Sequence, residues 1–270
     1  MRLPSARSPD PRALCPMILH AVEVGQGPPL VLLHGLFGAS RNFGVVQRRL
    51  ARRWRTIALD LRNHGDSPHD PDMRYPTLAG DVLETLAALD ALPCALLGHS
   101  MGGKVAMTTA LTRPEAVDRL LVSDIAPVAY ASHHRGLVEA MLALDLAPGL
   151  TRAAADAVLA RTVAVPAVRA FLLQNLRLGA TPVWRFGLTE IAHALPVAEG
   201  WDTPPDAAPY PGPTLFVAGA TSDYILPAYR PAIRALFPAA RFVTMKGVGH
   251  WVHADNPDGF TSIVEAFLAA

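Results

Sequence analysis

The residues best suited to chemistry surround Ser100, in the sequence Gly-His-Ser-Met-Gly. An apolar run, Cys94–Leu97, precedes this segment, and a helical run, Lys104–Leu111, follows it. A strand, a tight turn of small residues and a helix are the context of a nucleophile elbow, in which a serine hydroxyl projects from a strained turn. Gly98 and Gly102 fit this interpretation, because side chains there would collide with the neighbouring strand and helix. The pattern predicts that Ser100 is a nucleophile.

A serine hydroxyl is a weak nucleophile at neutral pH, so it needs a base, and the base needs an orienting acid. The last two histidines of the chain are His250 and His253. His250 follows the last expected strand across a glycine-rich loop, Gly247–Gly249, which lets an imidazole swing toward Ser100 at little steric cost. We therefore expect His250 to be the base, and His253 to pack against or cap the following helix.

Strand-like and helical segments alternate along most of the chain. A continuous apolar run is typical of a strand buried on both faces of a parallel sheet. Strands are expected at Ile18–Val24, Leu30–Leu33, Thr56–Leu59, Cys94–Leu97, Arg119–Val122, Thr214–Ala218 and Arg241–Met245. Helices are expected at Asn42–Arg52, Thr77–Leu89 with Thr77 as its N-cap, Lys104–Leu111, Ala228–Phe237 and Asn256–Leu268. This order predicts an α/β fold with a doubly wound, mostly parallel sheet.

The alternation stops between residues 131 and 205, where no strand-like run occurs. Helical segments replace it, at Gly136–Leu144, Arg152–Arg161, Ala167–Leu176 and Trp184–Ala194. This insertion enters at the carboxyl edge of the sheet, where such folds bind ligands, so we interpret it as a helical cap or lid. The expected organisation is a core of residues 17–130 and 206–270, a cap of residues 131–205, and a disordered leader of residues 1–16.

Four segments together resemble the α/β-hydrolase superfamily, and more narrowly its bacterial short-acyl esterases with acyl-CoA thioesterase activity. They are His34–Gly35, Asp60–Ser67, Gly98–Lys104 and Gly249–His253. The resemblance extends from about Met17 to the end of the chain. It implies the α/β-hydrolase fold with a helical cap insertion, and hydrolysis of a carboxylic ester or acyl thioester through an acyl-serine intermediate.

The orienting acid has two candidates. In most of this superfamily it follows the strand after the cap, as Gly-x-x-Asp, but here Ser222 occupies that position after Gly219, and Asp223 comes one residue later. In the esterase branch the acid instead follows the strand after the elbow helix, which corresponds to Asp124, and a serine takes the other position. We favour Asp124 with Ser222 in support, and keep Asp223 as the alternative.

An anionic intermediate at Ser100 needs two N–H donors. We expect them to be the backbone amides of Met101, directly after the nucleophile, and of Leu36, directly after His34 and Gly35. An apolar pocket for the acyl chain is expected from a set of mostly aromatic and aliphatic residues: Phe37, Phe171, Leu172, Leu176, Trp184, Phe186, Tyr224, Ile225 and Trp251.

Composition excludes several other classes of protein. The chain has 270 residues, 51% of them hydrophobic, which suffices for one large core or a core with a small accessory domain. Its net charge is +1, and no basic run is long enough to suggest nucleic-acid binding. No apolar segment reaches the length of a membrane span. Cys15 and Cys94 lack disulfide or metal-ligand spacing, which fits a cytoplasmic protein. We expect no metal and no cofactor, since no histidine pair with zinc spacing has a third ligand.

The leading prediction is therefore a carboxylesterase- or thioesterase-like serine hydrolase acting on a small-molecule acyl ester or thioester. The same residues would also serve on a C–C bond, a lactone or a peracid. A third possibility is a small-ligand receptor that has the pocket without the catalysis. The pairing of Ser100 and His250 with an available acid argues against the receptor. The sequence leaves the oligomeric state open.

Overall fold

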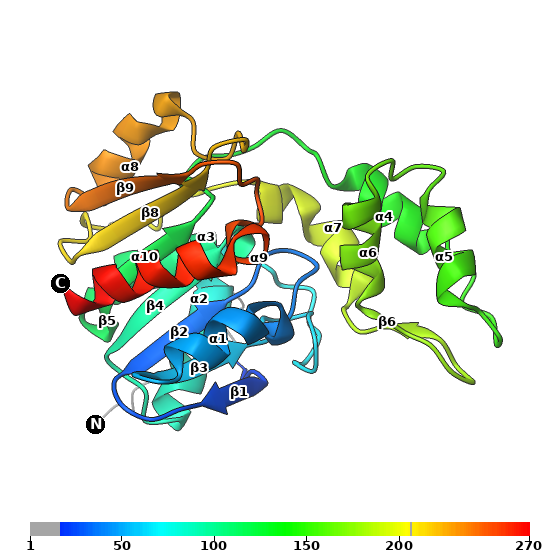
Figure 1. Cartoon of the computed structure of the whole chain (residues 1–270), viewed down its shortest axis with the longest axis horizontal. Coiled ribbons are helices and arrows are strands. Elements are labelled where there is room, and N and C mark those ends of the chain that lie inside the picture. Colours follow the sequence, from blue (N-terminus) through cyan, green and yellow to red (C-terminus); the bar gives the residue numbers. More distant parts are fainter. Residues whose placement is uncertain (1–16, 206) are drawn as a thin grey trace, which may run out of the picture.

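A seven-stranded sheet forms the centre of the protein (Figure 1), in a computed structural model that describes residues 17–205 and 207–270. The strand order is β1-β3-β2-β4-β5-β8-β9; β1 is antiparallel to β3, and the other strands are parallel. The leader expected at residues 1–16 lies outside the described residues. The strands are β1 Ala21–Val24, β2 Pro29–Leu33, β3 Arg55–Leu59, β4 Cys94–His99, β5 Val117–Ser123, β8 Thr214–Gly219 and β9 Ala240–Met245.

Helices cover both faces of this sheet, as the apolar runs predict. Alternate side chains of a strand point to opposite faces, so Leu30 and Leu32 of β2 pack in one cluster, and Val31 and Leu33 in the other. The first cluster includes residues of α1 and α10, and the second includes residues of α2, α3 and α8. The core helices are α1 Gly44–Leu50, α2 Tyr75–Ala88, α3 Met101–Thr112, α8 Arg230–Leu236, α9 Val252–Asp255 and α10 Pro257–Ala269, with 3-10 turns at Ser40–Phe43, Pro114–Ala116 and Pro227–Tyr229.

Helix α2 differs from its prediction at the N-terminus. It begins at Tyr75, and Arg74 rather than Thr77 is its N-cap. Pro76 lies in the first turn, where the missing proline N–H breaks no helical hydrogen bond. The Thr77 hydroxyl donates instead to Asp72 Oδ2 at 2.8 Å. The expected cap residue therefore sits inside the helix and fastens the segment before it.

The insertion between β5 and β8 lies beyond the carboxyl ends of the strands (Figure 1). It contains α4 Arg135–Leu142, α5 Arg152–Leu159, α6 Pro166–Leu173 and α7 Leu188–Glu199. The expectation that it has no strand is wrong, because β6 Leu176–Arg177 and β7 Val183–Trp184 form a short antiparallel ladder. Trp184 therefore lies in this ladder and not in the helix expected there, which begins four residues later at Leu188.

Two further features bear on the predicted location of the protein. Within residues 17–205 and 207–270, the structure contains no helix that is both long enough and apolar enough to cross a membrane. Cys94 is a free thiol buried in β4, and burial raises its pKa to about 12. A cytoplasmic location stays a prediction from the cysteine content.

Candidate active site

Ser100 occupies the sharp turn between β4 and α3. Its φ of 52° lies in the left-handed region, where a non-glycine residue is strained. The turn is compact because two glycines flank it: a Cβ at Gly98 would overlap the Gly102 carbonyl, and a Cβ at Gly102 would overlap the carbonyls of Leu33 and His34. The turn thus holds the Ser100 side chain at the carboxyl edge of the sheet, next to the first turn of α3.

The structure brings His250 and Asp124 to this serine. The Ser100 hydroxyl lies 3.1 Å from His250 Nε2, and His250 Nδ1 lies 2.7 Å from Asp124 Oδ2. With Nδ1–H donating to the carboxylate, Nε2 is free to accept the Ser100 proton. The three side chains come from the ends of β4 and β5 and from the loop after β9, which the parallel sheet places at one edge.

Asp124 is completely buried, and three further hydrogen bonds fix its position. Its Oδ1 accepts the Gly219 N–H at 2.9 Å, and its Oδ2 accepts the Ser222 hydroxyl as well as His250. Its own backbone N–H donates to Val217 O at 2.8 Å. The alternative acid, Asp223, is exposed, and its neighbour Ser222 is the residue of that loop that points to the Asp124–His250 pair.

The His250 ring is also held from its other sides. The Tyr224 ring stacks on it with centroids 4.1 Å apart, and His99 Nε2–H donates to the His250 carbonyl at 2.9 Å. His253 packs on Phe43 with ring centroids 4.7 Å apart, faces the His99 ring and lies against Phe260 of α10, so it packs against the following helix as predicted. Burial lowers the pKa of both His99 and His253, which keeps them neutral.

The two expected N–H donors for an oxyanion flank Ser100. Met101 is the first residue of α3, where a backbone N–H has no intrahelical acceptor. Leu36 lies in a turn, Gly35–Gly38, closed by the Gly38 N–H donating to Gly35 O at 2.9 Å. An ideal Cβ on Gly35 would lie 3.0 Å from the Ser100 Cβ, so this turn lies directly against the nucleophile.

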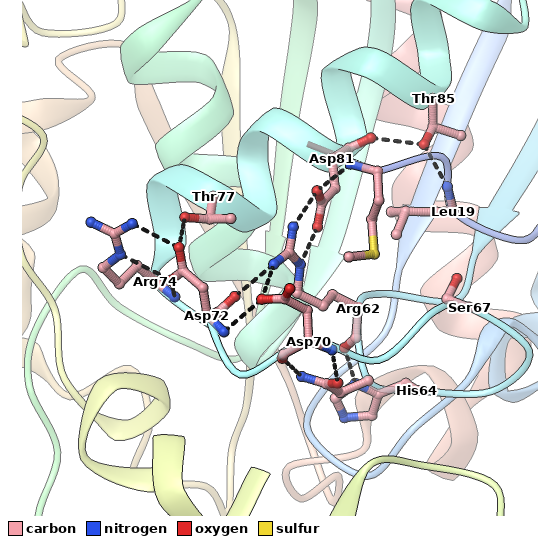
Figure 2. Close-up of polar contacts among 12 residues, drawn as sticks. Leu19, Arg62, His64, Ser67, Asp70, Asp72, Arg74, Thr77, Asp81 and Thr85 are labelled. Atoms are coloured by element: carbon pink, nitrogen blue, oxygen red, sulfur yellow. Dashed lines mark hydrogen bonds and ion pairs between the residues drawn. The ribbon is translucent and has the colours of Figure 1, made fainter. Parts of the chain in front are cut away.

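A buried ion pair of Arg62 lies beside His64 (Figure 2), and His64 connects it to the Gly35–Gly38 turn. Arg62 donates to both carboxylate oxygens of Asp81 in α2, at 2.7 and 2.8 Å, and to Asp70 at 2.8 Å. The Arg62 carbonyl accepts the Nδ1–H of His64 at 2.8 Å, and His64 Nε2 then accepts the Phe37 N–H at 3.2 Å. Because Nε2 must keep a free lone pair, His64 is neutral here, and burial lowers its pKa to about 3.

Two pockets meet at Ser100. We call the first the Trp251 pocket, and it is lined by residues 34–38, Asn42, His99, Ser100, His134, Leu137, Val168, Phe171, His250, Trp251 and His253. We call the second the Lys104 pocket, and it is lined by Leu36, Ser100, Met101, Lys104, Ile125, residues 130 and 131, His133, His134, Ala198, Glu199 and Tyr224. The insertion contributes walls to both.

The predicted pocket residues divide into two groups. Phe37, Phe171 and Trp251 line the Trp251 pocket, and Tyr224 lines the Lys104 pocket. The remaining five lie outside both walls and pack within the larger cluster of the core and insertion: Leu172, Leu176, Trp184, Phe186 and Ile225. The apolar spacing in the insertion thus mostly builds its own interior, with Phe186 reaching the site indirectly through its ring contact with Phe37.

Sequence reasoning missed Lys104 and Asn175. Lys104 is 1% exposed, and its Nζ donates to the carbonyls of Glu199 and Gly200 and lies 4.9 Å from the Tyr130 ring centroid. Its signal was available, because it is the one charged residue in α3, four positions after Ser100. Asn175 follows α6, and its Nδ2–H donates to Phe37 O at 2.7 Å. No local pattern marks it, since its partner lies 138 residues away.

The described residues also include a group with metal-ligand types, His20, Asp60 and Asp66. Asp60 already accepts three hydrogen bonds, from the backbone N–H groups of Ser40 and Asp66 and from His20 Nδ1. These bonds explain the group as a brace for the loop after β3, so it gives no ground for a cofactor in the site.

Comparison with known proteins agrees with this geometry. The family model for the alpha/beta hydrolase fold matches residues 28–257. The chain is 41% identical over 251 residues to an sn-1-specific diacylglycerol lipase, ABHD11, of Mus musculus, covering 90% of this chain and 81% of that protein. It is 37% identical to Esterase YbfF of Escherichia coli, covering 89% and 92%. A solved marine microorganism esterase superposes with a TM-score of 0.89 at 32% identity, covering 93% and 99%.

Proposed function

The chain belongs to the α/β hydrolase fold family and is a hydrolase of carboxylic esters, and we propose that Ser100 carries its acyl-enzyme intermediate. The observation that carries this proposal is the continuous hydrogen-bonded chain from Ser100 Oγ through His250 to the buried Asp124. Such a chain makes a serine hydroxyl nucleophilic at neutral pH.

In the first half of the proposed reaction, His250 Nε2 takes the Ser100 proton as Oγ attacks the acyl carbonyl carbon. The electron pair of the carbonyl π bond moves to oxygen, and the N–H groups of Leu36 and Met101 stabilise that anion. The intermediate then collapses, the bond to the leaving oxygen or sulfur breaks, and His250 returns the proton to it. Asp124 holds the imidazole in the required tautomer and stabilises its transient charge.

Water reverses the sequence in the second half. His250 accepts a proton from water, the hydroxide oxygen adds to the acyl carbon, and Ser100 leaves with the proton that His250 returns. Ser222 shares Asp124 Oδ2 with His250, so we assign it a supporting role that fixes the carboxylate rather than a proton-transfer step.

The two pockets suggest how a substrate divides between them. The Trp251 pocket has an apolar wall of Phe37, Phe171 and Trp251, which suits an acyl chain. The Lys104 pocket is lined by Lys104, His133 and Glu199, which suits the alcohol or thiol part. We propose that residues 131–205 act as a cap, because they supply one wall of each pocket, and that acyl thioesters are accepted beside esters.

The test is turnover of short acyl esters and acyl-CoA thioesters by the wild type and by Ser100→Ala. The alanine variant should fold and lose nearly all turnover, by about 10⁶-fold on the precedent of triads that act as a unit. A fluorophosphonate probe should label the wild type and not the variant. His250→Ala should lose a comparable amount, and the double variant little more. Near wild-type turnover by folded Ser100→Ala would exclude the serine mechanism.

A further inference from the structure

The turn Gly35–Gly38 contains the expected oxyanion donor, and its peptide groups are held in a defined order. The Gly35 carbonyl accepts two hydrogen bonds, from the Gly38 N–H at 2.9 Å and from His34 Nδ1–H at 2.8 Å. The Gly35 carbonyl and the Leu36 N–H belong to one planar peptide group, in which they point in opposite directions. Holding the carbonyl therefore fixes where the Leu36 N–H points.

The next peptide group of the turn is held by the insertion. The Phe37 carbonyl and the Gly38 N–H share a plane, and the Phe37 carbonyl accepts Asn175 Nδ2–H at 2.7 Å. Phe37 has a φ of 60°, a conformation that costs a non-glycine residue about 1 kcal/mol or more and that persists only when its surroundings hold it. Without the Asn175 bond, this peptide can rotate and release the Gly38 N–H from Gly35.

Asn175 is itself fixed at its other end. It is 2% exposed, and its Oδ1 accepts a hydrogen bond from the Arg41 guanidinium, which also donates to Gln174 O at 3.2 Å. The Asn175 carbonyl accepts the Arg185 N–H at 2.8 Å. The Asn175 side-chain oxygen thus accepts from the Arg41 cation, and its Nδ2–H donates to the turn. Both polar atoms of the side chain have hydrogen-bond partners.

We propose that Asn175 is a positioning residue for the oxyanion hole, linking the insertion to the donor that stabilises the transition state. This inference rests on the proposed function of Ser100. A series of hydrogen bonds begins at the Arg41 guanidinium and passes through the Asn175 side-chain amide to the Phe37–Gly38 peptide. It continues to the Gly35–Leu36 peptide and ends at the Leu36 N–H. Each group donates to the next, so the series orients the final N–H and polarises it toward an anion.

The proposal makes the insertion part of the catalytic geometry and not only a wall for substrate. His64 holds the Phe37 N–H from the core, and Asn175 holds the Phe37 carbonyl from the insertion. The turn therefore reaches its full set of hydrogen bonds only when the insertion lies against the core. When the insertion moves away, the Phe37 carbonyl loses the Asn175 bond, and the Leu36 N–H is held less firmly, with His34 as the remaining side-chain donor to the Gly35 carbonyl.

Asn175→Asp tests this contact directly. The aspartate keeps the shape and the contact with Arg41, but it presents an acceptor to the Phe37 carbonyl. The expected result is a loss of about 10- to 100-fold in kcat with KM within about twofold. The Leu36 N–H is misdirected and not removed, so the loss should stay below the 10²–10³ that removal of one oxyanion donor costs. A short-acyl trifluoromethyl ketone, which adds Ser100 to its carbonyl and forms an oxyanion, should bind more weakly by the same factor.

Two further variants distinguish the positioning of the Gly35–Gly38 turn by Asn175 from a general loosening of the insertion. Tyr75→Phe removes another hydrogen bond between core and insertion, from Tyr75 OH to Ala198 O at 2.6 Å, and should leave both quantities within about twofold. Arg41→Met changes an exposed side chain, leaves Asn175 in place, and should lower kcat and ketone affinity together by about threefold, the size of a weakened polar coupling. Thermal melts check that each variant folds.

The outcomes separate this inference from the proposed function. Unchanged ketone affinity in folded Asn175→Asp overturns the role of Asn175, and unchanged affinity in Arg41→Met overturns the role of Arg41. An equal loss in Tyr75→Phe would also overturn the proposal, because it would trace the effect to insertion loosening. If Asn175→Asp does not fold, the comparison of ketone affinity between Arg41→Met and Tyr75→Phe still tests the proposal. A wild type without ester turnover or probe labelling would instead contradict the proposed function.

Discussion

At the scale of single residues, the notable feature is the place of the acid. β5 and β8 are neighbours in the sheet, so the residues that follow them approach His250 from adjacent positions. Asp124 follows β5 and lies in the interior, whereas the loop after β8 brings Ser222 to the same carboxylate. The ends of both strands therefore reach the His250 imidazole. Which residue can act as the acid depends on which strand end carries a buried carboxylate.

This placement predicts a clear ranking of variants. Asp124→Asn should lower kcat by about 10⁴-fold, because the amide donates where the carboxylate accepts and holds His250 in the wrong tautomer. Ser222→Ala should cost about tenfold, the scale of losing a contact that orients the acid. Asp223→Asn, a change at an exposed side chain, should cost no more than that. The measurement is kcat/KM on one short acyl ester, with thermal melts as the folding control.

The reverse ranking would contradict the assignment. If Asp223→Asn lost most of its kcat/KM while Asp124→Asn kept nearly all of it, Asp223 after β8 would be the acid despite its one-residue displacement.

Some residues of the site could be predicted and others could not, for a physical reason. Ser100 and His250 lie in short glycine-rich segments whose local geometry the sequence encodes. Asp124 emerged only by resemblance, because one of two strand ends had to be chosen. Asn175 acts through a partner 138 residues away, and nothing near it in the chain reports that contact.

At the scale of secondary-structure elements, the strands and core helices follow from their periodicity, and the errors fall where side chains override it. Helix α2 begins before Thr77 because Pro76 starts the first turn and Asp72 takes the threonine hydroxyl. In the insertion, Leu176 and Trp184 pair across a short ladder, which a search for helical spacing does not detect. Short ladders carry too few residues to show a period of two.

Helix α2 is joined to the loop after β3 by the Arg62–Asp81 pair (Figure 2), and this junction predicts a large effect on stability. Both side chains are buried, at 1% and 0% exposure. Asp81→Asn removes the negative charge that both buried nitrogen donors of Arg62 contact, which should lower the free energy of unfolding by about 3–5 kcal/mol. Urea denaturation measures the change.

The matched control is the exposed pair Arg113–Glu115, with 62% and 66% exposure. Glu115→Gln should change the free energy of unfolding by less than about 1 kcal/mol, because solvent screens exposed pairs. Equal losses in the two variants would show that α2 is not fastened through Arg62.

At the scale of the whole molecule, four buried imidazoles connect the site to the surrounding core. His34 and His64 brace the Gly35–Gly38 turn, while His99 packs on the His250 ring and His253 packs on the His99 ring. Burial lowers the pKa of all four, to about 3 for His64 and about 4 for His253. Because His34 and His64 each accept a backbone N–H, protonation would break the hydrogen bonds that position the turn.

These imidazoles predict that the protein loses stability in mild acid. An unfolded histidine binds a proton as pH falls below about 6.5, whereas His253 in the folded protein stays neutral down to about 4. The unfolded state then binds more protons, so the stability present above pH 6.5 is lost as pH falls toward 4. For His253 alone the loss between pH 6.5 and 4.5 should be on the order of 2 kcal/mol.

His253→Leu tests this linkage, because leucine fills the site without a titratable group. The free energy of unfolding of the variant, measured by urea denaturation at pH 6.5 and 4.5, should fall by about 2 kcal/mol less than that of the wild type. Phe260→Leu is the control: its ring lies 6.2 Å from the His253 centroid, and its loss should lower stability equally at both pH values. A wild-type pH dependence retained in His253→Leu would mean that His253 accepts its proton without unfolding, and that the acid sensitivity arises at the other buried imidazoles.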